Sequence, residues 1–73
     1  MKQQITRYQQ IGLRLRLARE EAGLTQEEAA LRLGKSQSYI SRCETGKHRM
    51  DILELEAFSQ LYAKTITFFL IQD

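Results

Sequence analysis

The sequence contains no proline and no tryptophan, and it has only one cysteine and one histidine. A single cysteine excludes an internal disulfide, and no Cys/His cluster at metal-ligand spacing accompanies it, so we expect neither a metal nor a cofactor. No apolar run approaches the roughly 20 residues that span a bilayer, and the polar segment 1–10 lacks the apolar region of a signal peptide. The sequence therefore predicts a reduced, cytoplasmic protein with no membrane partner.

The chain of 73 residues is close to the size below which one core struggles to stabilise a fold without disulfides or metals. No segment shows the strict alternation of a strand, whereas capping residues and glycines divide the chain into helical segments. We predict an all-α fold in which a single domain covers residues 1–73. The expected helices are 6–22, 25–33, 36–45, 51–62 and 66–71.

The stretch from Thr25 to Gly46 carries the clearest local signal. Thr25 and Glu28 have the spacing of a capping box at the start of one helix, which Gly34 ends, and Ser36 can cap the next helix. Two helices joined by so short a glycine-containing turn must cross steeply. This arrangement is a helix-turn-helix.

The second helix of this motif has an outer face without apolar side chains. At 100° per residue, Ile40, Cys43 and Glu44 share the inner face. The opposite face contains Gln37, Ser38, Ser41, Arg42 and Thr45. Because glutamine, arginine and hydroxyl side chains hydrogen-bond to base edges, we predict that this face reads double-stranded DNA.

The net charge of +2 is small, but its distribution is uneven. Five basic residues lie between positions 32 and 49, with only Glu44 opposing them, and the balance reverses from position 51 onward. The five are Arg32, Lys35, Arg42, Lys47 and Arg49. Such clustering around the second motif helix is typical of a surface that binds a DNA backbone. His48 lies in the same basic stretch, with no cysteine or carboxylate positioned to make it a base or a ligand, so we do not expect an enzyme.

The first helix contains an arginine that requires a negatively charged partner. Its inner stripe consists of Tyr8, Ile11, Leu15, Ala18 and Ala22. Arg19 stands beside this stripe, and because an unpaired charge next to a core is costly, it needs a counter-ion. Glu44, on the inner side of the second motif helix, is the candidate. Within the same helix Gly12 costs roughly 1 kcal/mol against alanine unless something packs closely upon it.

The last two helices contain more apolar residues than one core face needs. The fourth helix should turn Ile52, Leu55, Phe58, Ser59 and Tyr62 inward. In the fifth helix Ile66, Phe69 and Leu70 face one way, and Phe68 and Ile71 face another. We expect Phe68 and Ile71, with Leu61 at their margin, to form a dimer or partner surface. Leu13 and Leu17, on the far side of the first helix, fit either a partner contact or ordinary surface exposure.

The segment IGLRLRLAREEAGLTQEEAALRLGKSQSYISRCETGK resembles the DNA-binding domain of the Xre/Cro/CI family of bacterial and phage regulators, through LTQEE, LG, SQSYIS and ETGK at the family's spacings. The resemblance implies a compact five-helix, lambda-repressor-like domain with the helix-turn-helix in its second and third helices. It also implies that Gln26 and Lys47 contact the DNA backbone, and it places the family's recurrent Arg–Glu pair on Arg19 and Glu44. The full set of expected phosphate contacts is Gln26, Ser36, Tyr39, Lys47 and Arg49.

Three positions depart from the family pattern. Ala18 and Cys43 stand where larger aliphatic residues are usual, which leaves the filling of that part of the core open. Ala63 replaces the usual glycine before the last helix and leaves the angle of that helix open.

Two hypotheses about function follow. The first is a transcriptional regulator, a repressor that reads a palindromic operator as a homodimer, without a small-molecule ligand. The alternative is a protein-interaction module, such as an antitoxin or the N-terminal domain of a larger regulator, whose exposed apolar residues bind a partner protein.

Overall fold

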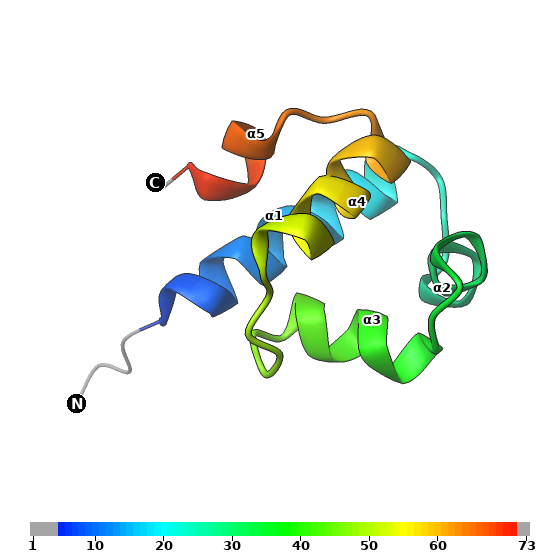
Figure 1. Cartoon of the computed structure of the whole chain (residues 1–73), viewed down its shortest axis with the longest axis horizontal. Helices are drawn as coiled ribbons and strands as arrows, with labels where there is room; N and C mark the ends of the chain where they lie inside the picture. Colours follow the sequence, from blue (N-terminus) through cyan, green and yellow to red (C-terminus); the bar gives the residue numbers. More distant parts are fainter. Residues whose placement is uncertain (1–4, 72–73) are drawn as a thin grey trace.

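The computed structural model describes residues 5–71, which form five helices and, within that range, no strand. The helices are α1 (Arg7–Glu21), α2 (Gln26–Leu33), α3 (Gln37–Glu44), α4 (Ile52–Tyr62) and α5 (Ile66–Leu70) (Figure 1). The predicted all-α fold is confirmed. Each helix lies inside the range expected from the sequence, and most differences are capping residues that flank a helix without belonging to it.

A capping side chain precedes every helix and explains where each one begins. The side chains of Thr6, Thr25, Ser36, Asp51 and Thr65 each accept a hydrogen bond from a backbone N–H in the first turn. Two helices end in the left-handed conformation, at Gly34 (φ +67°) and at Ala63 (φ +55°). Ala63 is the one non-glycine residue with positive φ in the described range.

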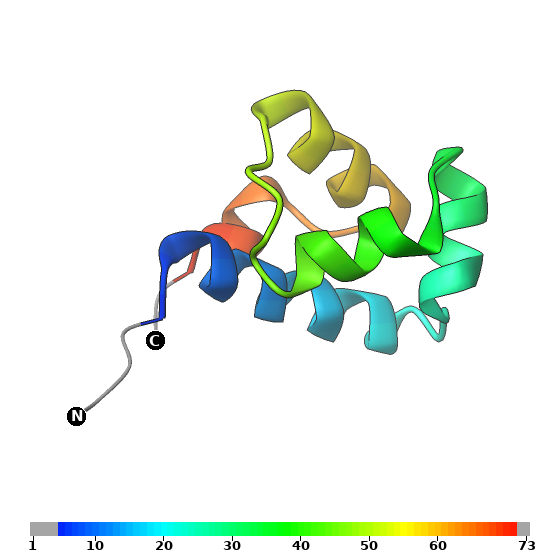
Figure 2. The same cartoon turned by 90° about the horizontal axis from the view of Figure 1, so that it is seen from below.

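The helices pack so that α3 contacts α1 and α2, while α5 packs on α1 and α4. In Figure 1 α1 and α4 lie together on the same side of α3, and in Figure 2 α3 lies in front of them while α2 closes one end of the domain. The largest fully buried side chains are Leu15, Ile40, Cys43, Phe58 and Phe69. Because this core lies behind α3, the side of α3 that faces away from it remains open.

Gly12 allows the backbones of α1 and α3 to touch. A Cβ atom at this position would lie 2.3 Å from the carbonyl oxygen of Glu44 and 2.7 Å from that of Cys43. The close packing that we required to justify a glycine inside a helix is therefore present. Ala18 and Cys43 are both fully buried in the core, and small side chains suit an approach this close.

Three residues that we expected to point inward are exposed. Ala22 lies beyond the last residue of α1, so it no longer follows the helical periodicity. Ile52 is 63% exposed at the first turn of α4, and Leu70 is 40% exposed in the short α5. Helical periodicity assigned these residues to the inward stripes, but each lies at or beyond a helix end, where the packing leaves its side chain exposed.

Phe68 is the opposite case, because we expected an outward side chain and it is half-buried. The Arg14 guanidinium lies 4.1 Å from the centre of its ring, and the Lys64 ammonium lies 4.7 Å from it. Arg14 Nε also donates a 2.9 Å hydrogen bond to the Phe68 carbonyl oxygen. Leu61 is half-buried as well, which leaves Ile71 as the exposed member of the expected surface.

Candidate DNA-binding surface

The outer face of α3 is polar and accessible. Gln37, Ser38, Arg42 and Thr45 are exposed, and Ser41 is half-buried between them. Arg42 Nη1 donates a 2.7 Å hydrogen bond to Ser38 Oγ, and Thr45 Oγ1 donates one of 2.9 Å to the Ser41 carbonyl oxygen. The five residues that we expected to read bases therefore share one surface, and the Arg42 guanidinium keeps further N–H donors beside the one bonded to Ser38.

A chain of hydrogen bonds connects the start of this surface to α1. Arg19 Nε lies 2.6 Å from Glu44 Oε2, and Arg19 Nη2 lies 3.1 Å from Oε1 of the same carboxylate. Gln26 Nε2 donates to Glu44 Oε1 at 3.0 Å, and Gln37 Nε2 donates to Gln26 Oε1 at 2.5 Å. The two glutamine amides, one at the start of each motif helix, are thus held in a defined orientation by a buried ion pair.

The Arg19–Glu44 pair is shielded from solvent. The side chains are 11% and 4% exposed, and Arg19 Nη1 additionally donates to the Leu24 carbonyl oxygen at 2.8 Å. The hydrogen bond to Glu44 raises the pKa of Arg19 against the opposing effect of burial. The ion pair expected from the sequence is present and ties α1 to the end of α3.

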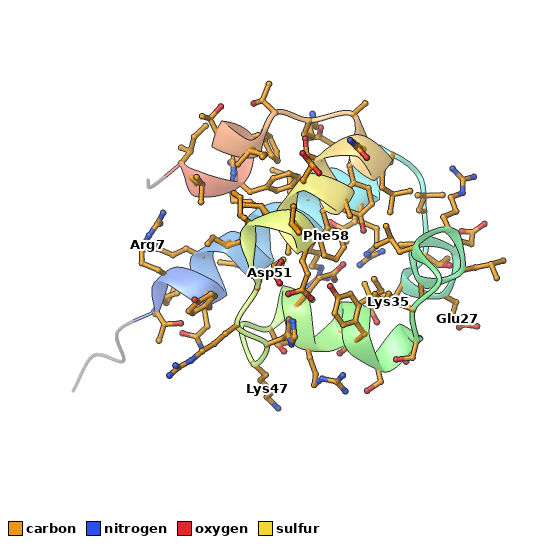
Figure 3. All side chains as sticks on the ribbon, in the orientation of Figure 1. Arg7, Glu27, Lys35, Lys47, Asp51 and Phe58 are labelled. Atoms are coloured by element: carbon orange, nitrogen blue, oxygen red, sulfur yellow. The ribbon has the colours of Figure 1, made fainter. Side chains whose placement is uncertain are left out.

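Exposed cations flank the outer face of α3. Arg49 and Lys47 lie in the loop after α3, and Lys47 extends from this loop away from the body of the domain (Figure 3). Lys35, in the turn before α3, lies 5.3 Å from the centre of the Tyr39 ring. The first N–H groups of α2 and α3 add partial positive charge, because the first turn of a helix has no intrahelical acceptors for them. The surface can therefore hold phosphates at both ends of α3.

Tyr39 does not fit the phosphate contact that we expected of it. Its side chain is buried, its ring stacks on Phe58 with centroids 6.2 Å apart, and its hydroxyl donates to Glu54 Oε2 at 2.6 Å. Burial and the bond to Glu54 raise the pKa of Tyr39 well above its ordinary value. Ser36 also has a structural role, since its Oγ caps α3, but its hydroxyl hydrogen can still be donated to a phosphate.

His48 has a carboxylate partner that sequence reasoning missed. Its Nε2 lies 2.8 Å from Glu54 Oε2, and its ring meets the Tyr39 ring edge to face at 5.2 Å. Glu54 is the third residue of α4 and forms the capping box with Asp51. The capping-box pattern could therefore have indicated that this carboxylate lies near the loop that contains His48. The arrangement anchors the basic loop to both α3 and α4.

The described residues show neither a reactive thiol nor a metal centre. Burial raises the pKa of the Cys43 thiol to about 11, despite an opposing hydrogen bond with Tyr39, so the thiol stays protonated near neutral pH. No group of three or more His, Cys, Asp or Glu side chains in residues 5–71 could hold a metal ion.

An open hollow of about 590 Å³ lies beside α3, and Gln26 and Thr45 contribute to its wall.

The geometry defines a helix-turn-helix protein, and comparison with known families agrees. The model of the helix-turn-helix domain family matches residues 10–65, and the chain belongs to this family. The family typically binds DNA in gene regulation and is typically non-enzymatic. No curated protein matches the chain. Within residues 5–71, no helix has both the length and the apolar character needed to cross a membrane.

Proposed function

We propose that this chain is a sequence-specific transcriptional regulator of the Xre/Cro/CI class that represses by occupying a palindromic operator as a homodimer. The observation that carries the proposal is the hydrogen bond between Gln26 and Gln37, which is supported from behind by Glu44 and Arg19. An oriented glutamine at the start of an exposed polar helix is suited to bidentate recognition of adenine. As a DNA-binding regulator, the protein would act in the cytoplasm.

The proposal divides the surface into two roles. The base-reading residues are Gln37, Ser38, Ser41, Arg42 and Thr45, and the phosphate-binding residues are Gln26, Ser36, Lys47 and Arg49. Phosphate contacts at both ends of α3 set the register, and side chains on its outer face read the major groove. Tyr39 leaves the phosphate set because its hydroxyl is bonded to Glu54.

A homodimer supplies the affinity that one domain lacks. One recognition helix reaches only a few base pairs, whereas two helices roughly 34 Å apart read successive major grooves on one side of the duplex. The matching operator is a palindrome with half-sites about one helical turn apart. The dimer is therefore part of the proposed mechanism of recognition.

Selection of bound duplexes from a randomised pool at one fixed salt concentration tests this function. We expect a palindromic consensus, and the logarithm of the binding constant for the winning duplex should fall linearly with the logarithm of the salt concentration. A pool without a consensus, together with weak and steeply salt-dependent binding, would contradict sequence-specific recognition. That result would favour the protein-interaction module, with Leu13 and Leu17 as the first residues to test.

Two substitutions separate base reading from phosphate binding. Arg42→Ala should lower affinity by about 1–3 kcal/mol and relax discrimination at one base pair, whereas Lys47→Ala should weaken all sequences alike and reduce the salt slope by about 1. Lys64→Ala is the control, because Lys64 lies between α4 and α5, outside the candidate DNA-binding surface, and its side chain pairs with Glu21. If the selected sequence is still discriminated after loss of Gln37, Arg42 and Lys47 together, the assignment of α3 is wrong.

A further inference from the structure

The outward side of α4 carries two adjacent and strongly exposed aliphatic residues. Ile52 is 63% exposed and Leu53 is 69% exposed, although both lie in the first turn of a helix whose other side forms part of the core. Glu56 follows on the same outward side and is exposed. We call these three residues the α4 face. Neither aliphatic side chain contributes to the buried core of its own domain.

A hollow adjoins the α4 face. It has a volume of about 250 Å³, and Lys35 and Asp51 are among its lining residues. The apolar side chains that line it are Leu33, Tyr39, Leu53, Ala57 and Phe58. In Figure 3 Lys35 and Asp51 lie on either side of the region in which Phe58 is placed. An aliphatic side chain from another molecule can enter this hollow and contact the apolar residues.

We propose that two copies of this chain associate through the α4 face, with Leu53 of each copy entering the hollow of the other. This inference rests on the proposed function and names the surface that pairs its two copies. In a contact with two-fold symmetry, one patch must supply both the inserted side chain and the hollow that receives it. The α4 face and its hollow lie side by side and meet this requirement.

The charges around the hollow favour a second copy over a partner of a single charge sign. Lys35 is the basic residue of the hollow, Asp51 and Glu54 are its acidic residues, and the acidic Glu56 lies beside it on the α4 face. In a two-fold arrangement, the basic side of one copy can face the acidic side of the other. A uniformly acidic or basic partner would meet like charge on one side of this surface.

Association through the α4 face leaves the outer face of α3 open and occupies one of the flanking cations, Lys35, which lines the hollow. α1 and α2 are the helices that pack most closely on α3, and Tyr39 of α3 stacks on Phe58 of α4 away from the polar outer face of α3. A second copy seated in the larger hollow beside α3 would cover DNA-binding residues, because Gln26 and Thr45 line that hollow. A copy seated there would compete with DNA.

The surface around Ile71 fits self-association less well. The hollow near this residue is lined by Ile5, Gln10, Leu13, Arg14 and Ile71, and the charge that it carries is of one sign. The neighbouring Phe68 ring is already covered by Arg14 and Lys64. Two copies meeting there would bring like charges together, which opposes association.

Sedimentation equilibrium of the full chain without DNA, from micromolar to millimolar concentration, tests the interface. We expect a monomer–dimer equilibrium that Leu53→Lys weakens by about tenfold or more, because a cation replaces the inserted aliphatic group. Leu53→Met should retain association. Circular dichroism should show that both variants are folded, since Leu53 lies largely in solvent.

Two matched control substitutions introduce a lysine at exposed aliphatic residues outside the α4 face. Leu31→Lys changes a residue on α2 that is 82% exposed, and Ile71→Lys changes the alternative surface. Both should leave the dissociation constant within about twofold of the unsubstituted chain, which is below the effect of a central interface residue. Dissociation caused by Ile71→Lys, an unchanged equilibrium in Leu53→Lys, or a chain that is monomeric throughout would each overturn the proposal.

DNA binding separates failure of the interface from failure of the proposed function. The probes are the duplex selected from the randomised pool and the same duplex with one half-site scrambled. Leu53→Lys should bind the single half-site as the unsubstituted chain does, and lose the gain in affinity that the second half-site provides. If no duplex is selected but Leu53→Lys still dissociates the dimer, the interface stands and the proposed function fails.

Discussion

Arg19 in α1 and Glu44 at the end of α3 form a two-point ion pair, with Nε–Oε2 and Nη2–Oε1 distances of 2.6 and 3.1 Å. The carboxylate also accepts a hydrogen bond from Gln26, so one buried group connects the first three helices. Because Gln26 in turn holds Gln37, the integrity of this pair affects both folding and the start of the candidate DNA-binding surface.

Arg19→Ala should lower the free energy of unfolding by roughly 3 kcal/mol, because Glu44 would remain buried without its counter-ion. Urea unfolding followed by circular dichroism measures this change. Arg16→Ala is the matched control, since Arg16 and Glu20 form an exposed pair whose side chains are 61% and 53% accessible. Its loss should change stability by less than about 0.5 kcal/mol. Equal effects of the two substitutions would contradict the importance of the buried pair.

Ala63→Gly should stabilise the protein by about 0.5–1 kcal/mol. Ala63 ends α4 with φ +55°, a conformation that glycine adopts without steric penalty. The control is Ala57→Gly, inside α4, where glycine should lower stability by about 1 kcal/mol. Thermal unfolding of both variants shows whether each substitution raises or lowers the stability. A lower melting temperature for Ala63→Gly would show that position 63 is not strained.

Two tyrosines should respond in opposite ways to removal of their hydroxyl groups. The Tyr62 hydroxyl is buried and has no hydrogen-bond partner among residues 5–71, so Tyr62→Phe should leave stability unchanged or raise it by up to about 1 kcal/mol. Tyr39→Phe should lower stability by about 1.5–3 kcal/mol, because its hydroxyl bonds to the Glu54 carboxylate. Denaturant titrations compare them. Marked destabilisation by Tyr62→Phe would indicate a partner for its hydroxyl in solution.

Glu54 should make stability depend on acid pH. Burial raises the pKa of its carboxyl, but hydrogen bonds from Tyr39, the Asp51 N–H and His48 outweigh burial and bring it from 4.5 to about 2. Since the folded-state pKa is depressed, the unfolded chain binds this proton first as the pH falls. The stabilising contribution of Glu54 is therefore complete above about pH 5 and is lost between there and about pH 2.

The comparison of Glu54→Gln with the unsubstituted chain isolates this effect. The stability difference between the two should shrink as the pH falls from about 5 to about 2, where Glu54 becomes protonated in the folded chain. Glu56→Gln is the control on the same helix, because Glu56 is exposed. A difference between Glu54→Gln and the unsubstituted chain that does not vary with pH would show that the carboxylate is not held by these hydrogen bonds.

Much of the fold could be predicted from local chemistry. Capping residues such as Thr25 and Asp51 define helix starts within four residues of sequence, and Gly34 supplies a left-handed helix end that few other residues tolerate. Helical periodicity then separates the polar outer face of α3 from its inner face. The same periodicity paired Arg19 with Glu44, because an arginine beside a core requires a nearby carboxylate.

Contacts between distant segments could not be predicted in this way. Glu54 Oε2 forms hydrogen bonds with both Tyr39 and His48. Arg14 covers the ring of Phe68, which lies 54 positions away in the sequence. Both contacts depend on how helices cross, which periodicity does not specify. The sequence by itself determined the five helices, their ends and the polar face of α3, because these follow from interactions within a few residues. Only the tertiary structure decided which polar groups remain available for DNA and which apolar side chains remain exposed. The reason is that packing of the helices engages some polar groups in internal hydrogen bonds and buries some apolar side chains.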